Sequence, residues 1–165
     1  MPGEADQQTY SKVLRHFTYG MYAVTAHSGE EDNAFTANWL SQCSFDPPLI
    51  MVSIQNDSRT RGLIRASGLF AVHVLATGQR EFAGMLGKSS LSIMNKLKNV
   101  RWHPSAVTAC PILEDTLGYI ECRVAGELAA GDSDIVLGEV IHAEMLSEEE
   151  IEPLTMKETG FKHFG

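Results

Sequence analysis

The residues of this sequence best suited to chemistry lie between Asn33 and Arg65. Hydroxyl, amide, thiol and aromatic side chains follow one another in the segment 36–44, which reads TANWLSQCS. Further along, Ser58, Arg59 and Thr60 bring two hydroxyls and a guanidinium together. An arginine with hydroxyls can bind a phosphate, and a polar segment with an aromatic can hold the ring at the other end of the same ligand. The two segments together predict a site for a phosphorylated ring cofactor.

A strand and a helix are expected to position the phosphate end of this site. Leu49 to Ile54 is a short apolar run rich in Ile and Val, bounded by prolines and by Asn56-Asp57, and is typical of a buried strand. Asp57 or Ser58 can cap the helix that follows, whose unpaired N–H groups and dipole favour an anion. The alternative is that Arg59, Arg61 and Arg65 are ordinary solvated charges on a surface helix.

The rest of the chain predicts several strands and a few helices. Apolar residues at 10, 13, 14 and 17 predict an amphipathic helix from about Asp6 to Phe17, laid against the body of the protein. Strands are expected over 21–26, 33–38 and 70–75, and helices over 79–86 and 89–97. Helices that do not alternate with every strand favour an antiparallel barrel over a doubly wound sheet. The length of 165 residues fits one domain, 1–165.

Two long antiparallel strands are expected around the turn 131–134. One face of the first strand is apolar, and the other is charged, as in a strand with one side facing water. The second strand runs from Ile135 to Met145. The apolar face consists of Ile120, Cys122, Val124 and Leu128, and the charged face of Glu121, Arg123 and Glu127.

Composition argues against several classes of partner and site. A net charge of -8 argues against nucleic acid or an anionic membrane. No window approaches the roughly 20 apolar residues of a membrane span, and the first residues resemble no leader, so we expect a cytoplasmic protein. The three cysteines are widely spaced and the histidines isolated, so we expect neither a disulfide nor a metal site. Cys122 is expected to be a small buried apolar residue.

The ordered motifs TANW, SQCSFDPPLIMVSI, SRT, SGLFAVHVL, CPILEDTLGYIECRV and GDSDIVLGEV resemble those of the flavin reductase-like, FMN-binding split-barrel family. The resemblance runs from Leu14 to about Val140. The family includes reductase components of two-component monooxygenases, flavoredoxins, and flavin domains of flavodiiron proteins and large rubredoxins. It implies a mainly β fold, an antiparallel, Greek-key split β-barrel with a few flanking helices. It also implies a homodimer with the cofactor at the interface.

The same resemblance implies FMN as the cofactor, with NADH or NADPH as the electron donor. The FMN phosphate would bind at Ser58, Arg59 and Thr60, and the isoalloxazine ring along 36–44. No side chain need act as an acid or base, because the flavin carries the redox chemistry. The implied cofactor-binding residues are Thr36, Ala37, Asn38, Trp39, Gln42, Cys43, Ser44, Ser53, Ser58, Arg59, Thr60 and His73.

Two of these residues have an alternative interpretation. His73 stands where family members commonly carry Asn near the flavin, but a lone histidine in a strand can equally be a hydrogen-bonded structural residue. Trp39 can stack on or flank the flavin ring, or be an ordinary barrel aromatic. Cys43 lies in the ligand segment with no neighbour that would activate a thiolate.

One motif departs from the family. Many reductase members carry Gly-Asp-His before the Gly-Glu-Val strand, with the His near the nicotinamide, whereas this chain has Gly131-Asp132-Ser133. Serine cannot carry a positive charge at neutral pH. The main hypothesis is an NAD(P)H-dependent oxidoreductase that reduces flavin or an acceptor through bound FMN. The alternative is an FMN electron carrier reduced by a protein partner, and a groove used for haem, another flavin or simple binding also stays open.

Aromatic residues near the C-terminus are expected to pack on the rest of the protein. Phe161 and Phe164 would be costly to leave in water. In the family the corresponding end lies close to the flavin or on the partner subunit.

Overall fold

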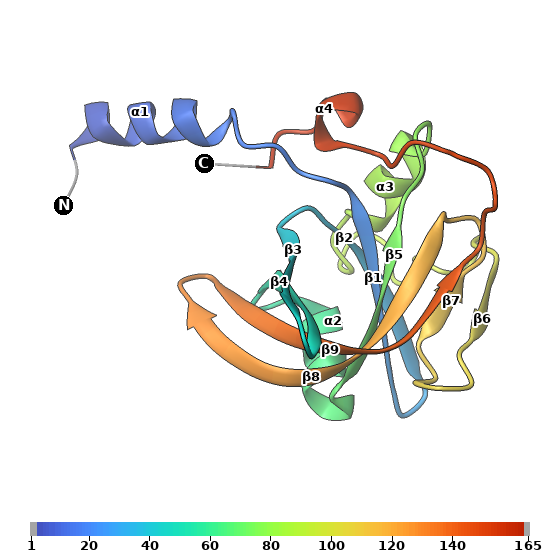
Figure 1. Ribbon diagram of the computed structural model, residues 1–165. Coiled ribbons are helices and arrows are strands. Elements are labelled where there is room, and N and C mark those ends of the chain that lie inside the picture. The colour runs from blue at the N-terminus through green and yellow to red at the C-terminus, as the bar shows by residue number, and fades with distance from the viewer. Residues whose placement is uncertain (1–2, 164–165) are drawn as a thin grey trace.

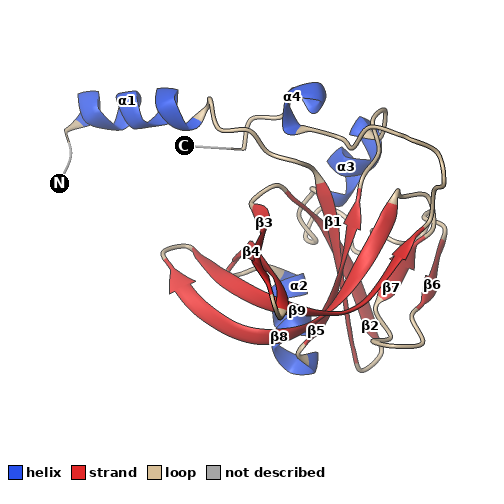
Figure 2. Ribbon diagram, in the orientation of Figure 1, coloured by secondary structure: helices blue, strands red, loops and turns tan. Residues whose placement is uncertain are grey.

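The computed structural model describes residues 3–163, which are organised around one seven-stranded sheet (Figures 1 and 2). The strand order is β2-β1-β5-β8-β9-β4-β3, and neighbouring strands are antiparallel throughout. The strands are β1 (Tyr22–Ser28), β2 (Glu31–Ala37), β3 (Leu40–Phe45), β4 (Pro48–Gln55), β5 (Leu69–Val74), β8 (Gly118–Ala130) and β9 (Ser133–Met145).

The sheet curls into a barrel whose two edge strands are consecutive in sequence. β2 and β3 lie at opposite ends of the strand order, yet only Asn38 and Trp39 separate them. At this junction the Ser53 N–H donates a hydrogen bond to the Trp39 carbonyl at 2.9 Å. The prediction of an antiparallel split β-barrel with flanking helices is therefore confirmed.

Alternating apolar residues fill the barrel, as their spacing predicts. Val24, Val52, Phe70 and Val136 are each less than 1% exposed. Gly138 of β9 makes room for the Phe70 ring, because a Cβ atom there would lie 2.4 Å from Phe70 Cζ. A glycine is thus required where the largest core side chain crosses the strand.

The described residues form four helices: α1 (Glu4–Leu14), α2 (Arg59–Ser67), α3 (Arg80–Leu86) and α4 (Met156–Thr159). α2 begins after Ser58, as the sequence predicts, and ends at Gly68, whose φ of 70° suits a residue without Cβ. Leu63 and Ile64 of this helix are buried against the barrel core. No helix within residues 3–163 is long and apolar enough to cross a membrane.

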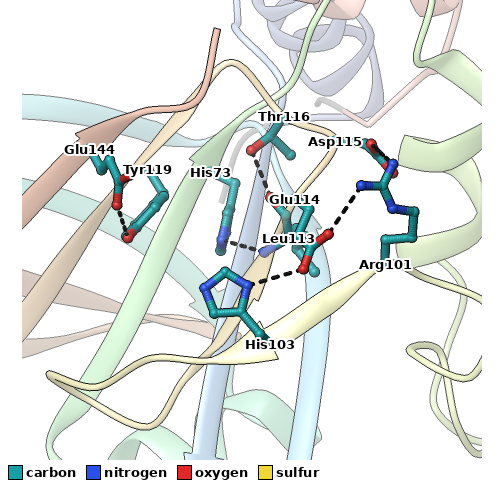
Figure 3. A network of polar contacts seen from close by, with 9 residues as sticks. All are labelled: His73, Arg101, His103, Leu113, Glu114, Asp115, Thr116, Tyr119 and Glu144. Carbon is teal, nitrogen blue, oxygen red and sulfur yellow. Dashed lines mark hydrogen bonds and ion pairs between the residues drawn. The ribbon is translucent and has the colours of Figure 1, made fainter.

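A small two-stranded sheet covers the outer face of β1 and β5. It consists of β6 (Trp102–Pro104) and β7 (Pro111–Leu113), neither of which the sequence analysis predicted as a strand. His73 is fully buried beneath it, and its Nε2 accepts the Leu113 N–H at 3.0 Å (Figure 3). Its Nδ1 must then carry the hydrogen, which it donates to the Ala23 carbonyl at 3.2 Å. Both ring nitrogens are satisfied by a neutral imidazole.

Acid is expected to destabilise the fold through His73. Burial lowers the pKa of His73 from 6.5 to about 4. Between these values the unfolded chain binds a proton that the folded protein does not, so stability falls as pH drops. The contribution is about 2 kcal/mol between pH 7 and pH 5. Urea unfolding at both pH values should show a smaller loss for His73→Asn, which keeps a donor and an acceptor but does not titrate.

The first helix forms as expected but does not lie against the body. α1 extends away from the barrel (Figure 1), and Tyr10, Val13 and Phe17 are 53%, 57% and 57% exposed. The expectation of a helix packed on its own chain is therefore wrong. The pattern of apolar residues identified the helix, but it carries no information on which surface covers the apolar face.

Two other expectations differ from the structure. Residues 89–97 form turns and no helix. β8 does not keep one apolar and one charged face, because β-bulges at Glu121/Cys122 and at Val124/Gly126 shift its register against β9. As a result Glu121 is fully buried, with an oxygen accepting a hydrogen bond from Thr108, while Leu128 is 64% exposed. Cys122 is buried as expected.

Candidate functional site

A cleft of about 820 Å³ opens at the junction between the two edge strands. Its walls come from the end of β2 with the Asn38-Trp39 junction, from the end of β4 with the start of α2, from residues 84–91, and from the C-terminal segment. The cleft thus brings together the two segments that the sequence analysis assigned to opposite ends of one ligand. Of the predicted residues, the lining includes Thr36, Ala37, Asn38, Trp39, Ser53, Ser58, Arg59 and Thr60.

The N-terminus of α2 forms one end of the cleft. Ser58 occupies the N-cap position, but its side chain makes no capping hydrogen bond. The first N–H groups of a helix have no partner within the helix, and the helix dipole makes this end positive. Thr60 is 1% exposed, and its Oγ1 has no hydrogen-bond partner among the described residues. A phosphate at this end would satisfy both kinds of donor.

Arg59 stands at the rim of the same end. Its guanidinium is half-exposed and pairs with Glu31, with Nη2 and Oε2 3.1 Å apart. An exposed pair of this kind contributes little stability, so the arginine is free to turn toward an anion.

The junction residues Asn38 and Trp39 form another wall of the cleft. The Asn38 Nδ2 lies 3.1 Å from Met156 Sδ and donates to the His163 carbonyl at 3.3 Å. The Trp39 ring lies 5.2 Å from the His163 ring, measured between centroids. Trp39 Nε1 is buried without a hydrogen-bond partner in the part of the chain described. A buried donor of this kind calls for an acceptor, such as a ring carbonyl of a ligand.

The C-terminal segment packs beside these junction residues, and Phe161 packs on the rest of the protein as expected. Phe161 packs against α3, with its Cζ 3.1 Å from the position that a Cβ on Gly84 would take. The Arg80 guanidinium lies 5.0 Å from the Phe161 ring centroid. Phe164, for which the same packing was expected, lies outside the described residues.

Four predicted residues lie away from the cleft. Gln42, Cys43 and Ser44 are on the edge strand β3, where Gln42 Nε2 donates to the Ser44 carbonyl and Cys43 Sγ lies 3.6 Å from the Leu49 carbonyl. Gln42 and Cys43 are exposed to solvent. His73 is buried on the outer side of the barrel, held by Ala23 and Leu113. The structure therefore joins 36–39 to 58–60 and leaves these four outside the cleft.

Residues that the sequence analysis did not select form the third wall. Lys88, Ser89 and Ser90 line the cleft beside Lys96. The buried Lys96 Nζ donates to the carbonyls of Ala34 at 3.1 Å and Leu86 at 2.8 Å, and burial lowers its pKa. In the sequence, the run Gly87-Lys88-Ser89-Ser90 places a cation and two hydroxyls next to a glycine, a pattern that could have indicated an anion site. The expectation of a helix over 89–97 obscured that signal.

A buried ion network connects the phosphate end of the cleft to the turn before β9. Arg61 of α2 is fully buried; its Nε lies 3.0 Å from Asp134 Oδ2 and its Nη2 2.6 Å from Glu127 Oε2. Arg65 Nη2 adds a third contact, 2.6 Å from Asp134 Oδ2. The adjacent Ser133 is 4% exposed, lines the cleft and donates from Oγ to Asp132. The turn Gly131-Asp132-Ser133, where this sequence differs from the family motif, therefore faces the candidate site.

The donors of the cleft fit a flavin. Open N–H groups, the unpaired Thr60 hydroxyl, Arg59 and Lys88 are suited to a phosphate. The unpaired Trp39 N–H is suited to a carbonyl of the ring. No group of three or more His, Cys, Asp or Glu residues within 3–163 is arranged to hold a metal ion.

Comparison with known proteins gives consistent matches over most of the chain. Residues 14–165 match the Flavin reductase like domain family. The reductase subunit HsaB of a flavin-dependent monooxygenase from Mycobacterium tuberculosis is 32% identical over 148 residues, which cover 90% of this chain and 75% of that protein. A flavin reductase (NADH) of Kitasatospora aureofaciens is 31% identical over 85% of this chain and 73% of its own.

A solved structure shows the same fold with ligands. The NADH:FAD oxidoreductase SgcE6 of Streptomyces globisporus, in complex with NAD and FAD fragments, superposes with a TM-score of 0.83 at 26% identity. The match covers 100% of this chain and 96% of that one.

Proposed function

The chain belongs to the flavin reductase-like domain family, and from that premise we propose that it is an oxidoreductase that binds FMN and takes electrons from NADH or NADPH. The observation that carries the proposal is the cleft itself. Its walls include an open helix N-terminus with the unpaired Thr60 hydroxyl and also Trp39, whose indole N–H is unpaired among the described residues. A ligand with a phosphate at one end and a ring carbonyl at the other satisfies both.

The residues of the chain would bind and orient the cofactor. Ser58, Arg59 and Thr60 would hold the phosphate of FMN, or of the chemically identical portion of a larger flavin, and Lys88 would add a second cation. Trp39 and the backbone of Thr36 to Asn38 would hold the ring. When bound, a flavin accepts a hydride from a reduced nicotinamide and passes two electrons on. Phe161 and His163 would restrict water at the ring end of the cleft.

Ser133 favours a second candidate, an electron carrier reduced by a protein partner. The residue lines the cleft, so the position faces the proposed site, yet its hydroxyl donates to Asp132 and carries no charge. A cationic side chain there could contact the nicotinamide nucleotide, whereas serine offers at most a weak contact.

The two candidates are separated by anaerobic titration of the flavin-loaded protein. If the first is correct, stoichiometric NADH or NADPH bleaches the visible flavin absorption. If the second is correct, the absorption persists with either nucleotide and disappears with dithionite. A protein that takes up no flavin after incubation with FMN would contradict both.

The substitution Ser133→His is expected to raise the rate of NADH oxidation about tenfold, the scale of one hydrogen bond to a charged group. The imidazole would extend into the cleft toward the nucleotide. Ser133→Asn is the matched control, because asparagine has similar size without the charge and should give a smaller gain. Stopped-flow reduction of bound flavin measures the rate. An equal gain in both variants would show that space, and not charge, limits the reaction.

We also propose a homodimer. Tyr10 and Val13 of α1 and Phe17, which follows the helix, leave apolar side chains in solvent, and Phe45 of the edge strand β3 is 90% exposed. These surfaces would be covered by a second copy. Light scattering should then give a mass of twice 18.1 kDa, and a single-chain mass would contradict the proposal.

A further inference from the structure

Two methionines line the candidate flavin cleft, and the sulfur of one of them has a polar contact. Met21 and Met156 belong to the same buried apolar cluster, and they are 4% and 5% exposed. The Asn38 Nδ2 lies 3.1 Å from Met156 Sδ. Met21 is held through its backbone, where its N–H donates to the Leu154 carbonyl at 3.0 Å. Met156 therefore combines a place in the cleft wall with an amide donor at its sulfur.

The Asn38 amide favours one chemical change at this sulfur. A thioether is a weak hydrogen-bond acceptor, whereas oxidation of methionine to its sulfoxide adds a polar oxygen. In an apolar cluster such an oxygen is costly unless a donor reaches it. Asn38 Nδ2 already contacts the Met156 sulfur, so it is placed to donate to a sulfoxide oxygen there. The polar contacts of Met21 within residues 3–163 are made by its backbone, so a sulfoxide at Met21 would gain no such stabilisation.

The oxidant for this change would form inside the same cleft. A bound flavin supplies hydrogen peroxide there when dioxygen reoxidises its reduced form. A lone pair of the Met156 sulfur then attacks one oxygen of the peroxide. The S–O bond forms as the O–O bond breaks, so the sulfur is oxidised by two electrons and the peroxide is reduced. The proton on the attacked oxygen passes to the leaving hydroxide, and the products are the sulfoxide and one water molecule.

We propose that Met156 is a modification site at which hydrogen peroxide formed in the cleft converts the thioether to a sulfoxide. The proposal rests on the proposed function for the source of the peroxide. The Asn38 amide, which donates to the His163 carbonyl at 3.3 Å, would turn to the sulfoxide oxygen. The C-terminal segment would lose that contact with the junction, and the cleft would hold its flavin less tightly. Reduction of the flavin without an acceptor would thus limit itself.

The first test reduces the FMN-loaded protein with one equivalent of dithionite in the absence of oxygen and then admits air, over repeated cycles. Dithionite makes the test independent of any nicotinamide donor, and catalase in the solution removes peroxide that escapes from the cleft. Mass spectrometry of peptides locates each added oxygen. We expect the sulfoxide at Met156 before Met94 and Met145, although the latter two are 86% and 72% exposed.

Hydrogen peroxide added to the flavin-free protein gives the matched comparison. Oxidation by an external reagent follows exposure, so Met94 and Met145 should then be oxidised before Met156. The order of modification should therefore reverse between the two experiments. In the cycles with bound FMN, Met21 serves as an internal control, because it lines the same cleft without an amide at its sulfur.

Fluorescence titration with FMN after the cycles measures the effect of the sulfoxide on the cleft. The oxidised wild-type protein should bind FMN about twofold to tenfold more weakly, the scale of one hydrogen bond. Met156→Leu, which keeps a similar apolar volume without the sulfur, should keep its own affinity through the same treatment. Met145→Leu, which removes an exposed sulfur that does not line the cleft, should lose affinity as the wild-type protein does.

Several results would overturn the inference while leaving the proposed function in place. Oxygen on Met94 or Met145 before Met156 during the cycles would mean that peroxide acts from solution. Equal oxidation of Met21 and Met156 would show that the Asn38 amide does not select the site. An unchanged FMN affinity of the Met156 sulfoxide would remove the proposed effect on the cleft. Failure of the untreated protein to bind FMN would instead contradict the proposed function, and with it the source of the peroxide.

Discussion

Replacement of Asp134 by asparagine is expected to lower the free energy of unfolding by about 3 to 5 kcal/mol, the cost of removing one partner of a buried ion pair. Asp134 Oδ2 contacts both Arg61 Nε and Arg65 Nη2. Arg61 is fully buried, and its Nη1 already lacks a partner among the described residues. Without the carboxylate, the guanidinium would keep only Glu127 to balance its charge. Urea unfolding at neutral pH measures the loss.

Glu127→Gln is the matched control for Asp134→Asn. Glu127 contacts the same guanidinium, but its side chain is 41% exposed, so water can replace much of the lost interaction. We expect a loss of about 1 kcal/mol. Equal losses in the two variants would mean that burial of Asp134 is not what makes its contacts important.

The substitution Arg59→Ala is expected to weaken FMN binding by about 1 to 3 kcal/mol, the scale for losing a charged hydrogen-bond partner. The residue follows the N-cap of α2 and lines the cleft, whereas its present partner Glu31 is 54% exposed. The free energy of unfolding should hardly change, because the exposed Arg59–Glu31 pair contributes little to it. Fluorescence titration with FMN gives the affinity.

Two further variants define what Arg59 does. Glu31→Gln should strengthen FMN binding slightly, since it frees the guanidinium from a competing carboxylate. Arg101→Ala removes a more exposed arginine whose ion pairs with Glu114 and Asp115 lie outside the cleft, and it should leave the affinity unchanged. If Arg59→Ala behaved like Arg101→Ala, the phosphate would bind elsewhere.

The parts of the fold that the sequence predicted depend on local patterns. The apolar run from Leu49 to Ile54 lies within β4, and Ser58 is the N-cap of α2. Both follow from side-chain periodicity and turn residues within a few positions. The two ends of the cleft could be predicted for the same reason, because each is a short segment with a distinct set of donors.

The remaining features depend on contacts between distant segments. Lys96 is buried because its ammonium reaches the carbonyls of Ala34 and Leu86, which no local pattern reveals. His73 was left between two interpretations, and only the position of Leu113 shows that it is a buried structural residue. Glu121 was expected in water, but β-bulges and the segment around Thr108 bury it.

The position of β9 has a consequence for how the protein folds. β9 pairs with β8 on one side and with β4 on the other, where Leu49 meets Glu139 and Gln55 meets Ser133. Pairing β4 with β9 closes a loop of about 80 residues, which is entropically costly before other contacts compensate. During synthesis β4 must therefore wait with one edge unpaired until β9 has emerged. The cleft, whose wall includes Ser133, can form only after that late step, so a flavin can stabilise the finished barrel but cannot guide its early assembly.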